Sequence, residues 1–189
     1  MAISKDNLIT YGLSGLLGNQ VVFRTQKGRT IVSKRTKPKD KKSEAQLKQR
    51  SRFSEATIYA KGAIADKNIR KLYDAKAQKS DKLQTAFNVA VSDYMRAPEI
   101  KHIDATGYRG NIGDVIIISA TDDFMVKEIK IEIESSDGAM VEKGSVFISP
   151  NGFEWEYKVQ SSNETLEGCK ITVRVFDLPG NVCEEKVVC

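Results

Sequence analysis

Four oxygen-bearing side chains are the residues of this chain best suited to holding a metal ion. Asp122 and Asp123 follow an apolar stretch, whereas Asp177 and Asn181 lie on either side of a Leu-Pro-Gly turn. If both segments belong to one β-sandwich, their turns can lie at the same end, where three carboxylates and an amide oxygen would suit Ca²⁺. Asp and Asn are also ordinary turn formers. The sequence therefore leaves two alternatives, Ca²⁺ as the one cofactor or turns without a metal.

The chain has three cysteines, all near its C-terminus: Cys169, Cys183 and Cys189. They have neither the spacing of a zinc site nor the density of a disulfide scaffold, which favours a reducing compartment or indifference to redox state. If Phe176 faces Val182 across the last turn, Cys169 lies opposite Cys189 and a disulfide between them is geometrically feasible. The same register points Glu185 toward the apolar side, so the alternative is a bulge there and buried free thiols.

Residues that commonly carry out catalysis are scarce. The single histidine, His102, lies between Lys101 and Ile103, and we interpret it as a structural or surface residue. The glycines at positions 12, 15 and 18 lack the Gly-Lys-Ser/Thr ending of a phosphate-binding loop, and a β-rich run follows them where such a loop needs a helix. We identify no catalytic residue and expect a protein that is not an enzyme.

The two halves of the chain carry opposite charge. Residues 1–98 contain 21 Lys/Arg against 8 Asp/Glu, a net charge of +13, whereas residues 99–189 contain 9 against 17, a net charge of −8. Such a division suggests that the basic half meets a polyanion, or that the halves of neighbouring molecules attract each other. The candidate partners are an acidic protein surface or other subunits, including a homo-oligomer, and nucleic acid.

A basic cluster between positions 24 and 52 is the candidate polyanion-binding site. Its members are Arg24, Lys27, Arg29, Lys34, Arg35, Lys37, Lys39, Lys41, Lys42, Lys48, Arg50 and Arg52. The only aromatic residues beside them are Phe23 and Phe53, at the two ends of the cluster, so a nucleic-acid contact would rest on phosphates and would not be sequence-specific. The alternatives are an acidic protein surface and a merely solvated face.

The pattern of apolar and polar residues predicts an α+β protein with two domains, residues 1–98 and residues 99–189. In residues 1–98 two β-rich runs around Lys27-Gly28 predict a hairpin, and Ser43 to Gln46 is a capping box that begins a helix with Phe53 in its core. Asp66 predicts a cap for a second helix, and Asp81 with Gln84 for a third. Residues 1–98 are therefore predicted to form a β-hairpin and a small helical bundle.

Residues 99–189 change to an alternation of period two. Short runs such as 115–118, 126–133, 153–159 and 171–175, separated by turn signals, predict an all-β immunoglobulin-like sandwich. The half resembles bacterial immunoglobulin-like modules in the segments 120–123, 126–131, 155–157, 175–177 and 180–181. That resemblance implies adhesion, spacing or assembly.

The first half is similar to uncharacterised proteins of Bacteroidetes-type bacteria and their phages, for which no activity is established. The resemblance rests on the glycine-spaced start, on the basic run 21–29 and on the helix opening at 46–56. It carries over no catalytic residue.

Together these features predict a non-enzymatic structural, assembly or protein-interaction module, phage-related or part of a larger particle. The alternative is a non-specific nucleic-acid-binding protein that uses the basic half. The first residues lack a secretory pattern and no apolar run approaches ~20 residues. We therefore expect a cytoplasmic chain, or a virion-associated one if phage-borne, with no membrane partner.

Overall fold

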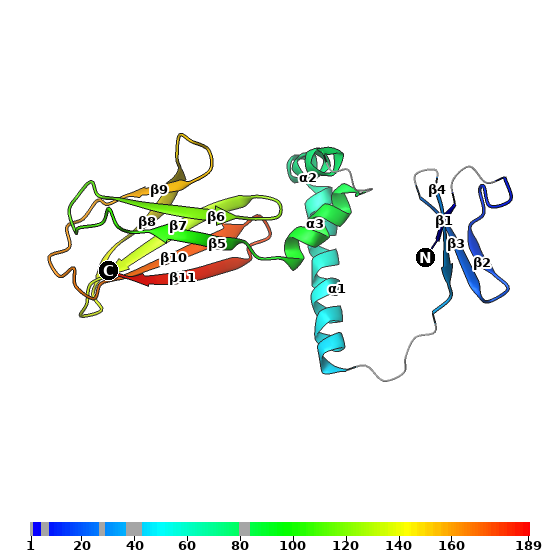
Figure 1. Cartoon of the computed structure of the whole chain (residues 1–189), viewed down its shortest axis with the longest axis horizontal. Coiled ribbons are helices and arrows are strands. Elements are labelled where there is room, and N and C mark those ends of the chain that lie inside the picture. Colours follow the sequence, from blue (N-terminus) through cyan, green and yellow to red (C-terminus); the bar gives the residue numbers. More distant parts are fainter. Residues whose placement is uncertain (1, 5–7, 27–28, 37–42, 80–83) are drawn as a thin grey trace. The chain divides into compact units, whose positions relative to one another are not determined.

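The computed structural model describes residues 2–4, 8–26, 29–36, 43–79 and 84–189 (Figure 1). The chain forms two compact units, residues 1–50 and residues 51–189. The predicted change from helix to strand near residue 98 is present, because one helix ends at Met95 and the next strand begins at Glu99. The division between the compact units nevertheless lies earlier, since the helices pack with the sandwich. No helix in the described ranges is long and apolar enough to span a membrane.

The first unit contains a four-stranded antiparallel sheet. Its strands are β1 (Ala2–Ser4), β2 (Gly15–Leu17), β3 (Val21–Gln26) and β4 (Arg29–Lys34), in the order β1-β4-β3-β2. The predicted hairpin is confirmed as β3 and β4, with Thr25 opposite Thr30. The two outer strands were not predicted, because three residues are too few to show an alternation. Gly12, Gly15 and Gly18 all have positive φ, so they supply turn conformations that other residues rarely adopt.

This sheet encloses almost no core. Of residues 8–25, 29–36 and 43–50, only Thr30 is buried, and its Oγ1 donates a hydrogen bond to the carbonyl oxygen of Thr10 at 3.1 Å. Leu8, Tyr11 and Leu17 are exposed. A sheet of this size has too little apolar surface to bury on its own.

Three helices follow: α1 (Glu44–Ala65), α2 (Lys67–Lys79) and α3 (Ala86–Met95). The predicted capping box begins α1, because the amide of Gln46 donates to Oγ of Ser43 and the amide of Ser43 donates to Oε1 of Gln46. Asp66 caps α2 through the amides of Asn68 and Ile69.

Two details of the helix prediction need correction. The helix α3 has Thr85 as its N-cap, whose hydroxyl accepts from the amide of Asn88 at 3.3 Å. The cap proposed at Asp81 lies outside the described residues. Phe53 is 52% exposed rather than in a helix core, because the buried face of α1 is made by the small residues Ala56, Ala60 and Ala63.

The second unit contains a seven-stranded antiparallel sandwich. The strands are β5 (Glu99–Asp104), β6 (Val115–Thr121), β7 (Val126–Glu134), β8 (Met140–Ile148), β9 (Trp155–Lys158), β10 (Lys170–Asp177) and β11 (Val182–Val188). They form one ladder in the order β11-β10-β7-β8-β9-β6-β5. The strand β8 pairs with β7 as far as Val146 and with β9 at Phe147 and Ile148, so it turns the corner between two layers.

This order is the immunoglobulin-like arrangement, with β5, β6, β9 and β8 in one layer and β7, β10 and β11 in the other. The predicted α+β class is therefore confirmed. The centre of the interior is formed by inward-facing β-branched residues, with tyrosines, Ala120 and Cys169 among the other buried side chains. The completely buried β-branched residues on the strands are Ile116, Ile118, Ile129, Ile131, Ile133, Ile171, Val173 and Val175. Their spacing of two follows from the strand repeat.

The helices pack against one end of the sandwich. A second core contains Ala60, Tyr73 and Val89 from the helices, with Phe124 and Leu178 from the sandwich loops packed against them. The rings of Tyr73 and Phe124 lie 4.4 Å apart between centroids. Alanines alone would give the helices a thin core, and the sandwich completes it. The helices and the sandwich therefore belong to one compact unit.

Candidate functional site

Three aspartates from separate segments meet where the helices pack on the sandwich. Asp93 lies in the last turn of α3, Asp122 in the loop between β6 and β7, and Asp177 at the end of β10. One carboxylate oxygen of each lies within 4.8 Å of the oxygens of the other two. We call Asp93, Asp122 and Asp177 the carboxylate cluster. Such a cluster can hold a cation or share protons.

Two of the three aspartates are positioned by their own loops. Oδ2 of Asp122 accepts hydrogen bonds from the amides of Phe124 and Met125 at 2.9 and 2.8 Å. Oδ1 of Asp177 accepts from the amides of Gly180 and Asn181 at 2.8 and 2.6 Å. Aspartate closes turns in this way because its short side chain reaches the backbone two to four residues ahead. The turns that the sequence predicted are thus present, and they aim the carboxylates.

Asp93, like Asp177, is almost completely buried, with 1% of its surface exposed. Burial raises the pKa of its carboxyl to about 7, even though the hydrogen bond from Tyr73 acts in the opposite direction, and the charges of Asp122 and Asp177 raise it further. Burial also raises the pKa of Asp177, against the hydrogen bonds from Asn181. Both shifts have the sign expected of carboxylates that are crowded together away from water.

The four predicted metal ligands divide into two groups. Asp122 and Asp177 meet in the cluster, whereas Asp123 forms an ion pair with Arg96. Asn181 turns its amide nitrogen inward and donates to Oδ2 of Asp177 at 2.7 Å and to the carbonyl oxygens of Tyr94 and Arg96 at 3.2 and 3.3 Å. It therefore acts as a connector between the last sandwich turn and the end of α3.

Sequence reasoning missed Asp93, the third member of the cluster. A signal was present, because Asp93 follows Val89 and Ala90 at the spacing of one helix face, and both of those are buried. An acid on the apolar face of a helix needs a partner inside the protein.

The predicted basic cluster is only partly within the described residues. The described members are all exposed: Arg24, Arg29, Lys34, Arg35, Lys48, Arg50 and Arg52. The others lie outside the described residues: Lys27, Lys37, Lys39, Lys41 and Lys42. Among the ion pairs of the described ranges, none includes a member of this cluster.

One face of the first sheet combines apolar and basic residues. Leu16 lies opposite Val22 and Arg24 lies opposite Ile31, so these four side chains share a face, together with Arg29 two residues before Ile31. Leu16 is 51% exposed, and both arginines are exposed. We call these five residues the arginine-rimmed face.

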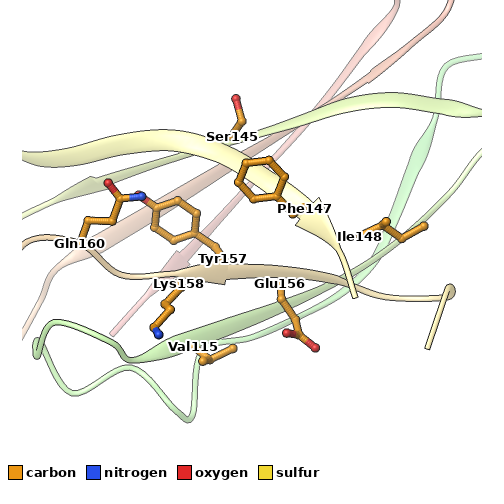
Figure 2. A pocket seen from close by; sticks show the side chains of 8 residues that line it. All are labelled: Val115, Ser145, Phe147, Ile148, Glu156, Tyr157, Lys158 and Gln160. Carbon is orange, nitrogen blue, oxygen red and sulfur yellow. The ribbon is translucent and has the colours of Figure 1, made fainter. Parts of the chain in front are cut away.

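An exposed groove lined by apolar, polar and charged residues lies across β8, β9 and β6 of the sandwich (Figure 2), and we call it the β8–β9 groove. Phe147 and Ile148 from β8 and Val115 from β6 line it, and Phe147 is 73% exposed. Glu156 of β9 lies in the same groove, and its Oε1 accepts from Oγ of Ser149. Large exposed aromatic residues beside a carboxylate are typical of an interaction surface.

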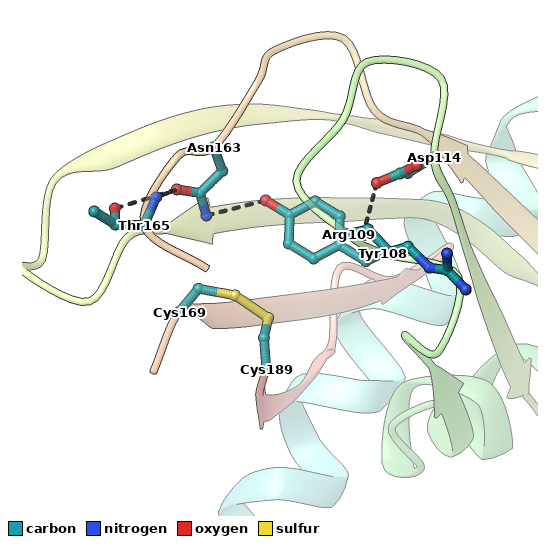
Figure 3. The surroundings of a disulfide bond; sticks show 7 residues. All are labelled: Tyr108, Arg109, Asp114, Asn163, Thr165, Cys169 and Cys189. Atoms are coloured by element: carbon teal, nitrogen blue, oxygen red, sulfur yellow. Dashed lines mark hydrogen bonds between the residues drawn. A yellow bond between two sulfur atoms is a disulfide. The ribbon is translucent and has the colours of Figure 1, made fainter. Parts of the chain in front are cut away.

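A disulfide joins Cys169 and Cys189 at the open end of the last hairpin, with Cα atoms 5.2 Å apart (Figure 3). The predicted register is confirmed, because Phe176 pairs with Val182 and the ladder continues without a bulge past Glu185. The alternative of a shifted pairing is therefore wrong. Cys183 is the free cysteine.

The loops around the disulfide are held by polar contacts. Nδ2 of Asn163 donates to the buried Oη of Tyr108 at 3.2 Å, and Oδ1 of Asn163 accepts from the amide of Thr165 at 3.1 Å (Figure 3). Asp114 accepts from the amides of Arg109 and Asn111, which lowers the pKa of its carboxyl. These are structural interactions that fix one end of the sandwich.

No protein-family model matches the chain, and no curated protein matches it in sequence. Among solved structures the chain is similar to the surface layer protein SbsC, in a structure of its domains 1–6. The identity is 15% and the TM-score is 0.31, and the match covers 77% of this chain and 24% of that one. The likeness is distant.

Proposed function

We propose that the chain is a non-enzymatic structural module that assembles with other copies of itself. In this proposal the arginine-rimmed face of one copy docks on the β8–β9 groove of the next. The observation that carries it is a small sheet with little buried apolar surface in its described part. One face combines the exposed Leu16 and the partly buried Val22 and Ile31 with two arginines that have no ion pair among the described residues.

The packing of the first unit supports a partner. Apolar surface that becomes buried on folding stabilises the folded state by about 25 cal/mol for each Å². In the described part of this unit that gain is small, because Thr30 is the one fully buried residue. The apolar residues Val21, Val22, Phe23, Ile31 and Val32 are only partly buried. A partner that covers Leu16, Val22 and Ile31 would increase that gain. The sheet is therefore expected to be stable chiefly when docked.

Charge supports a second copy as that partner. Arg24 and Arg29 have no ion pair among the described residues, and they flank an apolar strip. The groove on the sandwich places Phe147 and Ile148 beside the acid Glu156, and Glu154 follows Ile148 on the same hairpin. Lys158 also lines the groove, so its acids lie beside one base. The net charges of +13 and −8 on the two halves add a long-range attraction between copies.

The disulfide supports a location that differs from the cytoplasmic expectation. Disulfides persist in oxidising surroundings and are reduced by thiol systems in the cytosol. A module exposed on a cell surface or on a virion would keep the bond between Cys169 and Cys189. Thiol titration of the denatured chain, isolated without reductant, should find one of the three cysteines reactive; three reactive thiols would contradict this location.

Size-exclusion chromatography with light scattering tests the assembly. The full chain should form concentration-dependent oligomers at low salt and fewer at moderate salt, because salt screens exposed charges. Arg24→Glu/Arg29→Glu should abolish them, whereas Lys61→Glu/Lys67→Glu, an equal charge change on exposed helical residues, should not. A monomer at every concentration and salt level would overturn the proposal.

The same variants separate assembly from nucleic-acid binding. A gel-shift titration with random duplex DNA should show only weak binding by the wild type. Binding that is tight at moderate salt and lost equally in both charge variants would favour the phosphate-binding alternative, because such binding depends on total positive charge.

A further inference from the structure

We propose that Asp93, Asp122 and Asp177 form a Ca²⁺-binding site that fastens the helices to the sandwich. The site draws one carboxylate from α3, one from the β6–β7 loop and one from the end of β10. This inference is independent of the proposed self-assembly.

Two unused oxygens point to a ligand. Oδ1 of Asp93 and Oδ1 of Asp122 are both buried and have no hydrogen-bond partner among the described residues. The other oxygen of Asp93 accepts one hydrogen bond and the other oxygen of Asp122 accepts two. A buried acceptor without a partner costs about 1–3 kcal/mol, and more when it is charged. Native proteins satisfy such atoms with protein groups, water or an ion. Two of them in one cluster indicate that the missing partner is shared.

Within the described part of the chain, no basic side chain is paired with this cluster, since no ion pair there includes Asp93, Asp122 or Asp177. The nearby guanidinium of Arg96 is engaged with Asp123. Three carboxylates this close together, two of them buried, repel one another when no basic side chain is paired with them. One divalent ion would reverse that repulsion.

The spacing of the oxygens favours Ca²⁺. Oxygens within 4.8 Å of one another can surround an ion at the Ca²⁺–oxygen distance of about 2.3–2.6 Å with small side-chain movements. Mg²⁺ requires about 2.0–2.1 Å and a near-ideal octahedron. Asp93 also lines a surface pocket with Ser92 and Asp123, which gives an ion a route from solvent past the basic side chains of Lys76 and Arg96 that line the same pocket.

Ion binding would couple two parts of the second unit that are otherwise joined by a modest core. The ligands come from the helices on one side and from two sandwich loops on the other, so the ion is held only when both are docked. A ligand that binds only the folded state stabilises it in proportion to the logarithm of its concentration. Ca²⁺ should therefore hold the helices on the sandwich.

Titration calorimetry of the full chain, first stripped with chelator, measures the binding directly. We expect one Ca²⁺ per chain, and Mg²⁺ at least about tenfold weaker because of its stricter geometry. At a Ca²⁺ concentration about 100-fold above Kd the unfolding midpoint should rise by roughly 5–10 °C relative to chelator. Tb³⁺, a luminescent substitute for Ca²⁺, should emit on excitation through Tyr73, which donates a hydrogen bond to Asp93, and Ca²⁺ should quench that emission by displacement.

Three variants locate the site. Asp93→Asn and Asp122→Asn retain an oxygen for the hydrogen bonds from Tyr73 and from the β6–β7 loop, so folding is preserved. Each should weaken Ca²⁺ binding at least about tenfold, since affinity depends on ligand charge. The matched control is Asp123→Asn, an adjacent acid that is outside the cluster, and it should bind as the wild type does.

The sign of the stability change provides a second test. In chelator, Asp122→Asn should unfold at the same temperature as the wild type or higher, because it removes repulsion; in Ca²⁺ it should unfold lower. The proposal is overturned if no saturable binding is measured, if Asp123→Asn weakens binding as much as Asp122→Asn, or if Ca²⁺ leaves the wild-type midpoint unchanged.

Discussion

The hydroxyl of Tyr73 donates a hydrogen bond to Oδ2 of Asp93 at 2.5 Å, inside the contact between the helices and the sandwich. Oη of Tyr59 lies 2.9 Å from the same hydroxyl and extends the chain of polar groups toward the surface. Burial raises the pKa of Tyr73, so its hydroxyl keeps the proton that it donates. The contact between α2 and α3 therefore depends on a polar interaction within an apolar core.

Tyr73→Phe should lower the free energy of unfolding by about 1–3 kcal/mol, because Oδ2 of Asp93 then loses its donor in the interior. Tyr59→Phe is the matched control: it removes the outer hydroxyl of the pair and leaves Asp93 its donor, so the loss should be smaller. Urea denaturation in chelator measures both. If both variants lose the same free energy of unfolding, the hydrogen bond between Tyr73 and Asp93 adds nothing to stability beyond that of the outer hydroxyl.

Asn181→Ala should destabilise the joint between the last sandwich turn and α3. The side-chain amide donates to Asp177 and to the carbonyl oxygens of Tyr94 and Arg96, and its removal leaves these acceptors partly unsatisfied, at a cost of about 1–3 kcal/mol. Asn151→Ala is the comparison, since Asn151 bonds only within its own exposed turn among the contacts described. Amide hydrogen exchange in α3 should accelerate for the first variant alone.

Removal of the disulfide should cost about 3 kcal/mol of stability, the value for a loop of this size (sequence separation 20). The test compares Cys169→Ala/Cys189→Ala with Cys183→Ala, which removes the free thiol. Reductant should lower the unfolding midpoint of wild type and of Cys183→Ala, and should leave the double variant unchanged. A reductant effect on the double variant would exclude this bond as its source.

Local chemistry made much of the fold predictable. The alternation through Ile129, Ile131 and Ile133 set the inward face of a strand, and the pairing of Phe176 with Val182 fixed the last hairpin residue by residue. The caps at Ser43 and Asp66 marked two helix starts. Each of these signals lies within a few residues of the structure that it specifies.

The candidate site was predictable only in part, because it is tertiary. Asp122 and Asp177 were found through the turns they close, but Asp93 reaches them only after α3 packs on the sandwich. Likewise the side-chain amide of Asn181 contacts a backbone segment more than eighty residues away. No local pattern encodes such distances along the chain, so ligand sets that depend on them must be read from the fold.

Gly144→Ala should destabilise the sandwich, because a Cβ there would lie 2.8 Å from Cε2 and 2.9 Å from Oη of Tyr157. Overpacking of this kind costs about 1–3 kcal/mol. Gly62→Ala, in the interior of α1 with open space around its Cβ position, should instead stabilise by about 0.5–1 kcal/mol. Thermal unfolding distinguishes the two signs, and a neutral Gly144→Ala would show that the ring of Tyr157 can move aside.

Sedimentation velocity of a charge-exchanged pair tests the assembly claim most directly. Arg24→Glu/Arg29→Glu reverses the arginine-rimmed face, and Glu154→Lys/Glu156→Lys reverses the groove. Each variant alone should sediment as a monomer, because like charges then face each other. Their equimolar mixture should regain the oligomers of the wild type at low salt. A mixture that stays monomeric while the wild type assembles would contradict the pairing of these two surfaces.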